Sequence, residues 1–382
     1  MRPARVLLIT NIISPYRIPL FNYLCNQSGL EFKVITLGEK EANRQWQIMK
    51  NQIEFDYQIL PGWHKFIWSK EMPLHLNWGL WRILQTYQPD VLVTSGYDAL
   101  AYWEAFVYSK IHNKRFILWN GTTLLSTGKM RGLAGLMKRI IIKGADRYVS
   151  YGTKAAEYLE YFGAPRERIH VGVNTVDMEW YRREWYAAKE GVSFQVERPK
   201  YPPVMLLYVG QLIERKNVKR VLEALVRLRD PDLGIFIVGS GPQESELREF
   251  CRGFEMHNVY FEGFKQQSEL PRYYSMADIL VLPSIKEVWG LVVNEALATG
   301  LYVLCSNRAG AAYDLIKEGW NGRVFDPYNV DQLAELIHAT KLQIEEIRAR
   351  REAISEHACR EFSIERSAKA FLDAIEAVSH YP

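Results

Sequence analysis

Two kinds of hydrophobic pattern alternate along the chain. Short apolar runs are each followed by a segment in which apolar positions recur every three or four residues, as on the buried face of a helix. The clearest runs cover residues 6–10, 90–96, 116–121, 204–209, 234–238, 278–283 and 302–305. Buried parallel strands that alternate with helices produce this pattern. It therefore predicts an α/β protein built of doubly wound parallel sheets.

The alternation is interrupted near the middle of the chain. Residues 182–203 are polar, contain prolines and show little periodicity, which is typical of a linker. The 382 residues are enough for two cores. We expect a Rossmann-like acceptor-binding domain over 1–181, a linker over 182–203, a Rossmann-like donor-binding domain over 204–362 and a C-terminal helix over 363–382. This last helix is expected to pack back on the first domain, and the two domains to face each other across a cleft.

Composition and charge narrow the class of protein. Apolar residues make up 48% and charged residues 24%, as in ordinary globular proteins. Basic residues exceed acidic ones by 48 − 44 = 4, which is too few to indicate nucleic-acid binding. The four cysteines lack the paired spacing of zinc or redox sites, and no run reaches the roughly 18 apolar residues that span a bilayer. The apolar run at 6–10 is too short for a signal peptide, so we expect a cytoplasmic protein.

The stretch from Ser284 to Ala298 carries the most informative chemistry. It follows the apolar run 278–283, and a helix is predicted to begin near Gly290. The start of a helix offers unpaired N–H groups that suit a phosphate. Glu287 and Glu295 flank this start, and carboxylates accept hydrogen bonds from sugar or ribose hydroxyls. Together they suggest a nucleotide-sugar, although a surface helix with a first-turn glutamate gives the same pattern.

Four landmarks between residues 204 and 340 resemble, in the same order, the retaining glycosyltransferases of family four. Glu287 and Glu295 match that family's glutamate–seven residues–glutamate motif. Residues 208–217 resemble its glycine–arginine loop with the downstream phosphate lysine, and residues 238–242 its glycine–x–glycine–proline loop. Residues 307–315 with 321–322 resemble the segment that closes the donor site, whereas in the first half only residues 13–17 and the strand order are similar. The resemblance implies a GT-B fold and retaining transfer of a sugar from a nucleotide-sugar.

The resemblance also implies roles for individual residues. Lys216 would neutralise the diphosphate leaving group, Glu287 would hold hydroxyls of the transferred sugar, and Glu295 would hold the ribose. Asn120 is expected near the reacting carbon, where many relatives carry a histidine or an acid, but an asparagine cannot act as a general base. Further donor contacts are expected from Ser14, Tyr16, Gln211, Arg215, Gly239, Gly263, Phe264, Gly290, Leu291 and Val292. Gln211 and Asp314 depart from the family, which usually has arginine and glutamate there.

The expected mechanism needs neither a metal nor another cofactor. The main contribution would be electrostatic stabilisation of the departing phosphate, and the front-face attack implied by the resemblance requires no dedicated nucleophile. Asp230 and Asp232 have the spacing of a metal-binding pair, but a turn between a helix and a strand commonly contains Asp and Pro. Two other functions fit parts of the sequence: a nucleotide-sugar epimerase or hydrolase, and a non-catalytic sugar-binding protein.

Two segments suggest which acceptor and which surface the protein binds. Residues 61–81 are rich in aromatic residues, namely Trp63, Phe66, Trp68, Trp78 and Trp81. Residues 129–143 form a basic, amphipathic segment that suits an anionic membrane surface, or equally an ordinary surface helix. We expect a UDP- or GDP-linked donor and a glycan or lipid-linked acceptor, as in polysaccharide or glycoconjugate synthesis, with peripheral attachment to the inner face of the plasma membrane.

Overall fold

The computed structural model describes residues 2–41, 44–48, 50–67, 72–128 and 132–379. The chain forms two compact units. The first contains Met1–Asn174 and Ile364–Pro382, and the second contains Thr175–Ser363. Each unit is built on a parallel sheet that is covered by helices, so the predicted α/β class is confirmed.

The sheet of the first unit has seven strands in the order β3-β2-β1-β6-β7-β8-β9. Their bounds are β1 (Ala4–Thr10), β2 (Leu30–Thr36), β3 (Asp56–Ile59), β6 (Val91–Thr94), β7 (Arg115–Asn120), β8 (Arg147–Ser150) and β9 (Ile169–Val171). The helices of this unit are α1 (Ile18–Cys25), α2 (Leu80–Tyr87), α3 (Leu100–Ile111), α4 (Leu124–Thr127), α5 (Gly132–Gly144), α6 (Thr153–Phe162) and α16 (Ile364–Ser379). A separate antiparallel hairpin joins β4 (Gly62–Ile67) to β5 (Met72–Asn77), in a region for which the sequence predicted only aromatic crowding.

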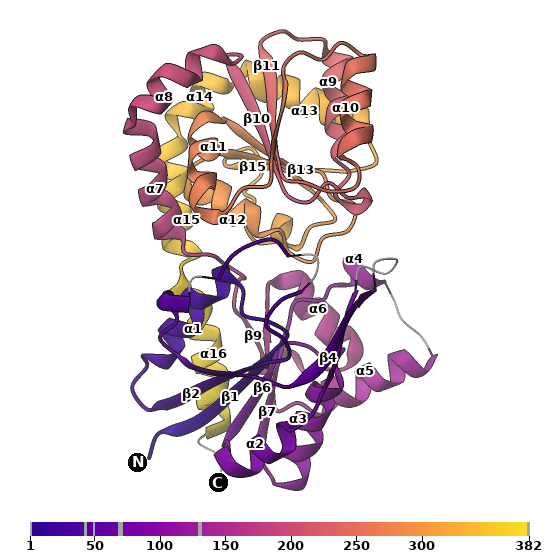
Figure 1. Ribbon diagram of the computed structural model, residues 1–382, viewed down its shortest axis with the longest axis vertical. Helices are drawn as coiled ribbons and strands as arrows, with labels where there is room; N and C mark the ends of the chain where they lie inside the picture. Colours follow the sequence, from indigo (N-terminus) through magenta and orange to yellow (C-terminus); the bar gives the residue numbers. More distant parts are fainter. Residues whose placement is uncertain (1, 42–43, 49, 68–71, 129–131, 380–382) are drawn as a thin grey trace. The chain divides into compact units, whose positions relative to one another are not determined.

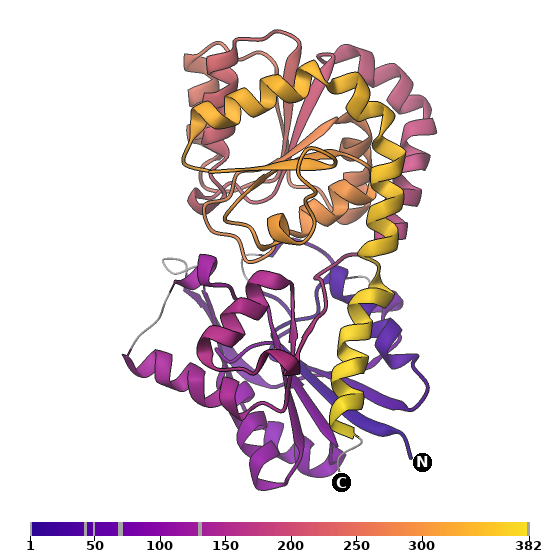
Figure 2. The same ribbon diagram turned by 180° about the vertical axis from the view of Figure 1, so that it is seen from behind.

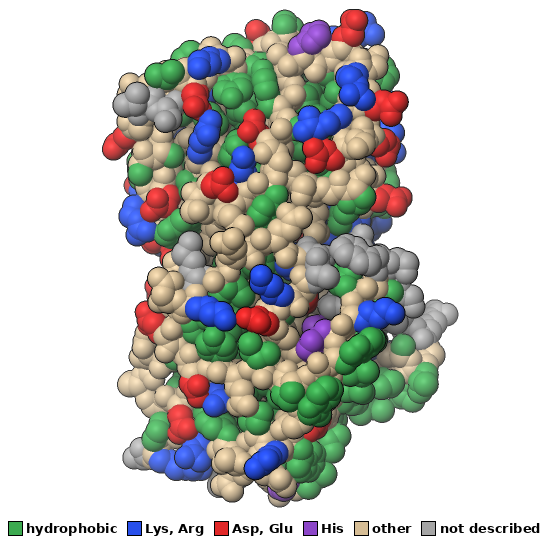
Figure 3. Space-filling model, viewed as in Figure 1, with side chains coloured by type: hydrophobic (Ala, Val, Ile, Leu, Met, Phe, Trp, Pro, Cys, Tyr) green, Lys and Arg blue, Asp and Glu red, His purple; other side chains and the backbone are tan. Residues whose placement is uncertain are grey.

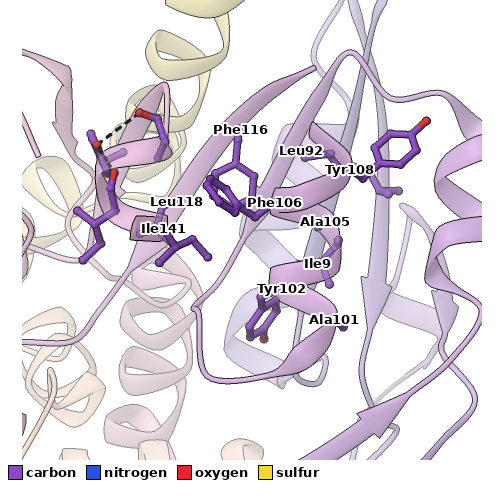
Figure 4. Close-up of a cluster of buried hydrophobic side chains, with 14 of the residues drawn as sticks. Ile9, Leu92, Ala101, Tyr102, Ala105, Phe106, Tyr108, Phe116, Leu118 and Ile141 are labelled. Atoms are coloured by element: carbon purple, nitrogen blue, oxygen red, sulfur yellow. Dashed lines mark hydrogen bonds between the residues drawn. The ribbon is translucent and has the colours of Figure 1, made fainter. Parts of the chain in front are cut away.

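Both faces of this sheet are buried, because successive side chains of a strand point to opposite sides. Along β1, Leu7 and Ile9 join the core under α2, α3, α5 and α6, whereas Val6 and Leu8 join the core under α1 and α16. Figure 4 shows the first of these cores around Phe106 and Phe116, whose ring centroids lie 5.2 Å apart. This double burial explains why the strands read as continuous apolar runs.

The sheet of the second unit has six strands in the order β12-β11-β10-β13-β14-β15. The strands are β10 (Val204–Val209), β11 (Leu233–Val238), β12 (Val259–Gly263), β13 (Ile279–Leu282), β14 (Tyr302–Ser306) and β15 (Gly322–Phe325). The helices are α7 (Met178–Glu190), α8 (Val192–Glu197), α9 (Val218–Leu228), α10 (Glu244–Gly253), α11 (Leu270–Met276), α12 (Leu291–Ala298), α13 (Val330–Leu342), α14 (Ile344–Ala349) and α15 (Arg351–Glu361). Among these strands, β15 was not predicted, because a short edge strand gives a weak pattern.

The expected linker differs from the structure. Most of residues 182–203 belong to α7 and α8, and they lie inside the second unit, whose boundary falls between Asn174 and Thr175. The Asp177 carboxylate caps α7 by accepting a hydrogen bond from the Trp180 N–H at 2.9 Å. Tyr181 and Trp185 are buried against the rest of the unit. Only a narrow stripe of α7 is apolar, which explains why its periodicity was hard to see in the sequence.

The last helix returns to the first unit. α16 follows the second unit in the chain but packs on α1, β8 and β9, as Figures 1 and 2 show from opposite sides. The Phe371 ring lies 5.1 Å from the Trp119 ring of β7, centroid to centroid. Within the part of the chain that is described, no helix has both the length and the apolar character needed to cross a membrane.

Candidate donor-binding site

The carboxyl ends of five neighbouring strands in the second unit carry the residues singled out in the sequence. Because β12, β11, β10, β13 and β14 are parallel, these ends meet at one edge of the sheet. Gly263 and Phe264 follow β12, Gly239 follows β11, and Gln211, Arg215 and Lys216 follow β10. Glu287, Gly290, Leu291, Val292 and Glu295 follow β13. The fold therefore brings the predicted donor-binding residues of this unit together.

Backbone hydrogen bonds join three of these loops. The Gly210 N–H donates to the Val238 carbonyl at 2.9 Å, and the Gly239 N–H donates to the Gly263 carbonyl at 2.8 Å. Gly239 has φ +145°, and a Cβ atom at this position would lie 1.8 Å from the Gly210 carbonyl oxygen. Glycine is required here because the two loops touch through their backbones.

Lys216 is fixed at the end of a short 3-10 helix, Glu214–Lys216. The Ile285 N–H donates to the Arg215 carbonyl at 2.9 Å, which attaches this loop to the loop after β13. Asn217, with φ +57°, donates from Nδ2 to the Pro327 carbonyl at 2.9 Å and to the Pro283 carbonyl at 3.2 Å. These bonds hold the Lys216 backbone between two strand-end loops.

Lys216 and Glu287 form an ion pair. Lys216 Nζ donates to Glu287 Oε2, and Ser284 Oγ donates to the same oxygen at 3.3 Å. Burial raises the pKa of Glu287, but the Lys216 ammonium, with help from Arg215 and Ser284, outweighs burial and holds this pKa below its usual value. The sequence assigned Lys216 and Glu287 to different parts of the donor and did not foresee that they bind each other.

The start of α12 is shaped by its N-cap residue. Gly290 has φ +100°, and a Cβ atom there would lie 2.7 Å from Leu282 Cδ2. Leu291 and Val292 form the first turn of α12, which leaves N–H groups without partners inside the helix. The preceding loop is anchored by Trp289, whose Nε1 donates to Asn294 Oδ1 at 2.9 Å. The arrangement can hold an anion at the positive end of the helix.

Glu295 is more deeply buried than expected for a residue that holds the ribose of the donor. Its side chain is buried and accepts a hydrogen bond from the Tyr274 hydroxyl at 2.5 Å, with a second from Tyr181. Burial raises the pKa of Glu295, although both tyrosine hydrogen bonds act in the opposite direction. The two tyrosines come from α11 and α7, so no local motif near Glu295 could have indicated them.

The remaining residues of this unit lie around the same edge. Phe264 is exposed, and Gly263 has φ +72° with open space where a Cβ would lie. The Gln211 carbonyl accepts from the Tyr208 hydroxyl at 2.7 Å, and Arg215 Nη1 lies 3.5 Å from the Lys286 carbonyl. Asp314 caps the short 3-10 helix Gly310–Tyr313, within the segment that the resemblance assigns to closing the donor site.

Ser14, Tyr16 and Asn120 belong to the first unit and lie at the carboxyl ends of β1 and β7. The Tyr16 ring lies edge-on to Trp46 at 5.5 Å, and burial raises the pKa of Tyr16 despite nearby Arg44 and Arg17. The buried Asn120 amide is used by its own loop, since Nδ2 donates to the Thr122 carbonyl at 3.0 Å. Ser14 is buried at the start of the next 3-10 helix.

Three further expectations can be compared with the structure. Lys341 Nζ lies 2.6 Å from Asp230 Oδ2 and 2.9 Å from Asp232 Oδ2, so a lysine neutralises this aspartate pair at its turn. The basic segment forms α5 from Gly132 onward, while Lys129 and Arg131 lie outside the described residues. Trp68 of the aromatic stretch also lies outside them.

Comparison with known proteins agrees with this geometry. Residues 191–361 match the family model described as glycosyl transferases group 1. The chain is 28% identical over 187 residues to an uncharacterized glycosyltransferase of Methanocaldococcus jannaschii, covering 47% of this chain and 46% of that one. It is 33% identical over 186 residues to a glycogen synthase of Mycobacterium tuberculosis, covering 48% and 42% respectively. The chain thus spans less than half the length of these two curated relatives.

A solved structure extends the similarity to both units. HepE of Anabaena, solved in complex with UDP, superposes with a TM-score of 0.75 at 15% identity, over 98% of this chain and 100% of that one. At this identity the likeness establishes the fold. The chain therefore has the GT-B fold, and within it residues 191–361 match the glycosyl transferases group 1 family.

Proposed function

We propose that the protein transfers a sugar from a nucleotide-sugar to a glycan acceptor, with retention of configuration at the transferred carbon. One observation carries the proposal: Lys216, the Glu287 carboxylate and the start of α12 lie at one edge of the second sheet, with Glu295 one turn further along α12. A cation and helix N–H groups suit a diphosphate, and carboxylates suit sugar and ribose hydroxyls. The group 1 family match and the UDP complex of HepE support the same donor class.

The proposed reaction breaks the bond between the sugar carbon and the β-phosphate oxygen and forms a bond to an acceptor oxygen. The acceptor oxygen attacks the sugar carbon directly and its proton passes to the departing phosphate, so no side chain needs to act as a nucleophile or as a general base. Lys216 and the N–H groups of Leu291 and Val292 stabilise the negative charge that develops on the phosphate. Because these groups supply the positive charge, we propose that transfer needs no metal. Glu287 then leaves Lys216 in part and accepts hydrogen bonds from the sugar.

Variants of two nearby lysines test the donor site. We expect Lys216→Gln to weaken binding of the preferred UDP- or GDP-sugar and to lower kcat by about 100-fold or more, because leaving-group stabilisation is lost. Lys219→Gln is the matched control, since Lys219 pairs with Glu246 on the surface at 2.9 Å. A thermal-shift panel of nucleotide-sugars identifies the donor, and transfer to a glycan is measured with and without chelator.

The outcomes separate the proposal from its alternatives. Unchanged transfer by Lys216→Gln, or loss of transfer on chelation, would contradict the proposed leaving-group chemistry. Turnover of donor without any acceptor would favour an epimerase or hydrolase instead. A chain that binds a nucleotide-sugar but never turns it over would be a binding protein.

We also propose that the acceptor is lipid-linked and that α5 lies on an anionic membrane. Leu133, Leu136, Met137 and Ile140 follow helical spacing and are 74%, 55%, 43% and 50% exposed, while Ile141 and Ile142 on the other side are buried. Figure 3 shows hydrophobic side chains gathered over α3 and α5. The helix contains no acidic residue, and Arg139 and Lys143 are exposed beside the apolar face. An exposed apolar stripe with basic flanks suits anionic lipid.

Lipid vesicles test this surface. Wild-type protein is expected to sediment with vesicles that contain an anionic phospholipid at low salt, and less with neutral vesicles. Leu136→Glu should abolish sedimentation because it places a charge in the apolar stripe. Leu342→Glu is the control, because Leu342 is even more exposed than Leu136, at 73% against 55%, but lies on α13 of the second unit. Equal sedimentation of both variants would rule out α5 as the contact.

A further inference from the structure

Arg17 is a buried cation whose partners are all neutral. It ends the 3-10 helix Pro15–Arg17, directly after the loop that follows β1, and is only 9% exposed. Its guanidinium carbon lies 4.4 Å from the Trp119 ring centroid and 4.9 Å from the Tyr151 ring centroid. Its Nη1 donates to Asn174 Oδ1 at 2.6 Å. Among the described residues, Arg17 forms no ion pair with a carboxylate.

Other partly buried arginines are compensated more fully: Arg351 donates to three backbone carbonyls, and several others have anionic partners. Arg198 lies 3.4 Å from an oxygen of Asp278, and Arg182 lies 2.5 Å from an oxygen of Glu352. A charge that leaves water without a counter-ion costs several kcal/mol, as an order of magnitude, and arginine cannot escape this cost by losing its proton. Two aromatic faces and one amide recover only part of the cost. Arg17 is therefore less fully compensated than these arginines, and an anion would supply what is missing.

The guanidinium retains donors for such an anion. It carries five N–H bonds, of which one is used by Asn174. None of the Arg17 nitrogens is among the fully buried side-chain atoms that lack a partner, so its other donors remain reachable from solvent. The Arg17 side chain is thus held by its two ring contacts and by Asn174, while some of its N–H donors remain available to a ligand.

The surroundings of Arg17 are built from three further strands at the same edge of the first sheet. Trp119 is near the end of β7, Tyr151 follows β8, and Asn174 follows β9. A Cβ atom at Gly121 would lie 2.5 Å from a carbon of the Tyr151 ring, so a glycine is needed for this ring to lie where it does. The carboxyl edge of a parallel sheet is where α/β proteins bind ligands.

We propose that Arg17 is the anchor of an anion-binding site in the first unit and that its ligand is a phosphate group. A guanidinium with open donors matches phosphate oxygens in geometry and charge. The choice of phosphate rests on the proposed function, in which the substrates carry phosphate. Two sources share this chemistry: the diphosphate of the nucleotide-sugar, and the phosphate of a lipid-linked acceptor.

Binding by variants of the full chain tests the site. The probes are inorganic pyrophosphate, UDP and a short-chain prenyl phosphate, each titrated by calorimetry. In Arg17→Gln the affinity for at least one probe should fall about tenfold or more, the loss expected for one charge-assisted hydrogen bond. Arg17→Lys should fall between wild type and Arg17→Gln, because it keeps the charge but loses the planar fork. Arg5→Gln is the control, since Arg5, on β1, likewise lies near a tyrosine ring but pairs with Glu31 at 3.1 Å.

The probe whose affinity falls in Arg17→Gln identifies the source of the phosphate. Loss of UDP binding in Arg17→Gln assigns the site to the donor, and loss of prenyl phosphate binding with UDP retained assigns it to the acceptor. Unchanged affinity of folded Arg17→Gln for all three probes overturns the proposal. The proposed function is judged separately, because Lys216→Gln would still lose the donor if only the Arg17 site were wrong.

A measurement on wild-type protein covers the case in which the Arg17 variants do not fold. Phenylglyoxal modifies accessible arginines, and the peptide that contains residue 17 reports on this one side chain by mass. We expect pyrophosphate or the prenyl phosphate to protect residue 17 from modification, while Arg5 reacts at an unchanged rate. Equal modification of residue 17 with and without these probes would overturn the site.

Discussion

Two glutamates eight residues apart, Glu287 partly buried and Glu295 buried, have opposite electrostatics. Glu287 receives an ammonium and a hydroxyl, so its pKa lies below the usual value in spite of burial. Glu295 receives only two tyrosine hydroxyls, so burial dominates and its pKa is raised. One carboxylate is therefore stabilised as an anion, whereas the other is held in a place that favours its protonated form.

Glu287 should stabilise the protein only above acidic pH. A carboxyl with a lowered pKa contributes stability that is present above its ordinary pKa of 4.5 and is lost as pH falls below it. At pH 7, Glu287→Gln should lower the free energy of unfolding by about 2 kcal/mol, because it leaves Lys216 without its anion. Urea unfolding at several pH values measures this, and a difference from wild type that persists unchanged at pH 3 would contradict it.

Glu295 should show the reverse behaviour. A carboxyl with a raised pKa contributes stability that is fully present below 4.5 and is lost as pH rises through its folded-state pKa. We expect Glu295→Gln to stabilise the protein at pH 7 by about 1 kcal/mol, with the gain vanishing at acidic pH. The same variant should weaken donor binding about tenfold if Glu295 holds the ribose. A melting temperature that falls at pH 7 would show that the carboxylate is needed for stability.

At the scale of elements, the candidate donor site depends on how closely the strand-end loops approach each other. The loops after β10 and β11 touch through Gly210 and Gly239, and the loop after β13 turns into α12 at Gly290. Gly210 and Gly239 have no side chains, so the backbone alone sets the geometry of their contact. The loops can therefore position N–H groups and Lys216 with little freedom.

Gly239→Ala should disrupt this edge. The new Cβ would collide with the Gly210 carbonyl at 1.8 Å, and φ +145° is unfavourable for any residue with a side chain. We expect a loss of about 3 kcal/mol or more in the free energy of unfolding, together with loss of donor binding. Gly263→Ala is the control, because its φ of +72° adds strain but its Cβ meets no atom within 4 Å. Equal effects of the two variants would show that backbone strain, and not loop contact, is responsible.

At the scale of the whole molecule, the chain closes its first unit with its last helix. α16 covers one face of the first sheet, where Ile364, Ala368, Phe371 and Ile375 join the core formed by Val6, Leu8 and Trp119. The first unit is therefore completed only after the second unit has been made. Its stability depends on contacts between residues more than 200 positions apart in sequence.

Phe371→Ala should destabilise the first unit by about 3–5 kcal/mol, the usual cost of removing a buried phenylalanine ring. The ring is 2% exposed and packs on Trp119, so little relaxation is available. Phe254→Ala is the matched control, because Phe254 is 55% exposed, and it should cost less than about 1 kcal/mol. Urea unfolding followed by tryptophan fluorescence measures both, and a cost below 1 kcal/mol for Phe371→Ala would contradict the role given to α16.

The sequence by itself was enough to predict the α/β class, and it supplied candidate residues for a donor site. Strands buried on both faces must be apolar throughout, so β1, β7, β10 and β13 stand out as continuous runs. Glu287 was selected because it lies in the loop between such a strand and a helix start, whereas Lys216 and Gly239 were selected because their loops resemble family four. Local pattern was sufficient for the fold class, and the resemblance was needed for the individual residues.

Only the tertiary structure decided how these groups pair and which segments belong together. The Lys216–Glu287 ion pair, the tyrosines on Glu295 and the rings around Arg17 join residues from separate elements, and the sequence contains no local signal for such contacts. The same reason explains why residues 182–203 read as a linker, although α7 packs Tyr181 and Trp185 into the second unit. Hydrophobic periodicity reports which face of an element is buried, but the partner that buries it is chosen by packing in three dimensions.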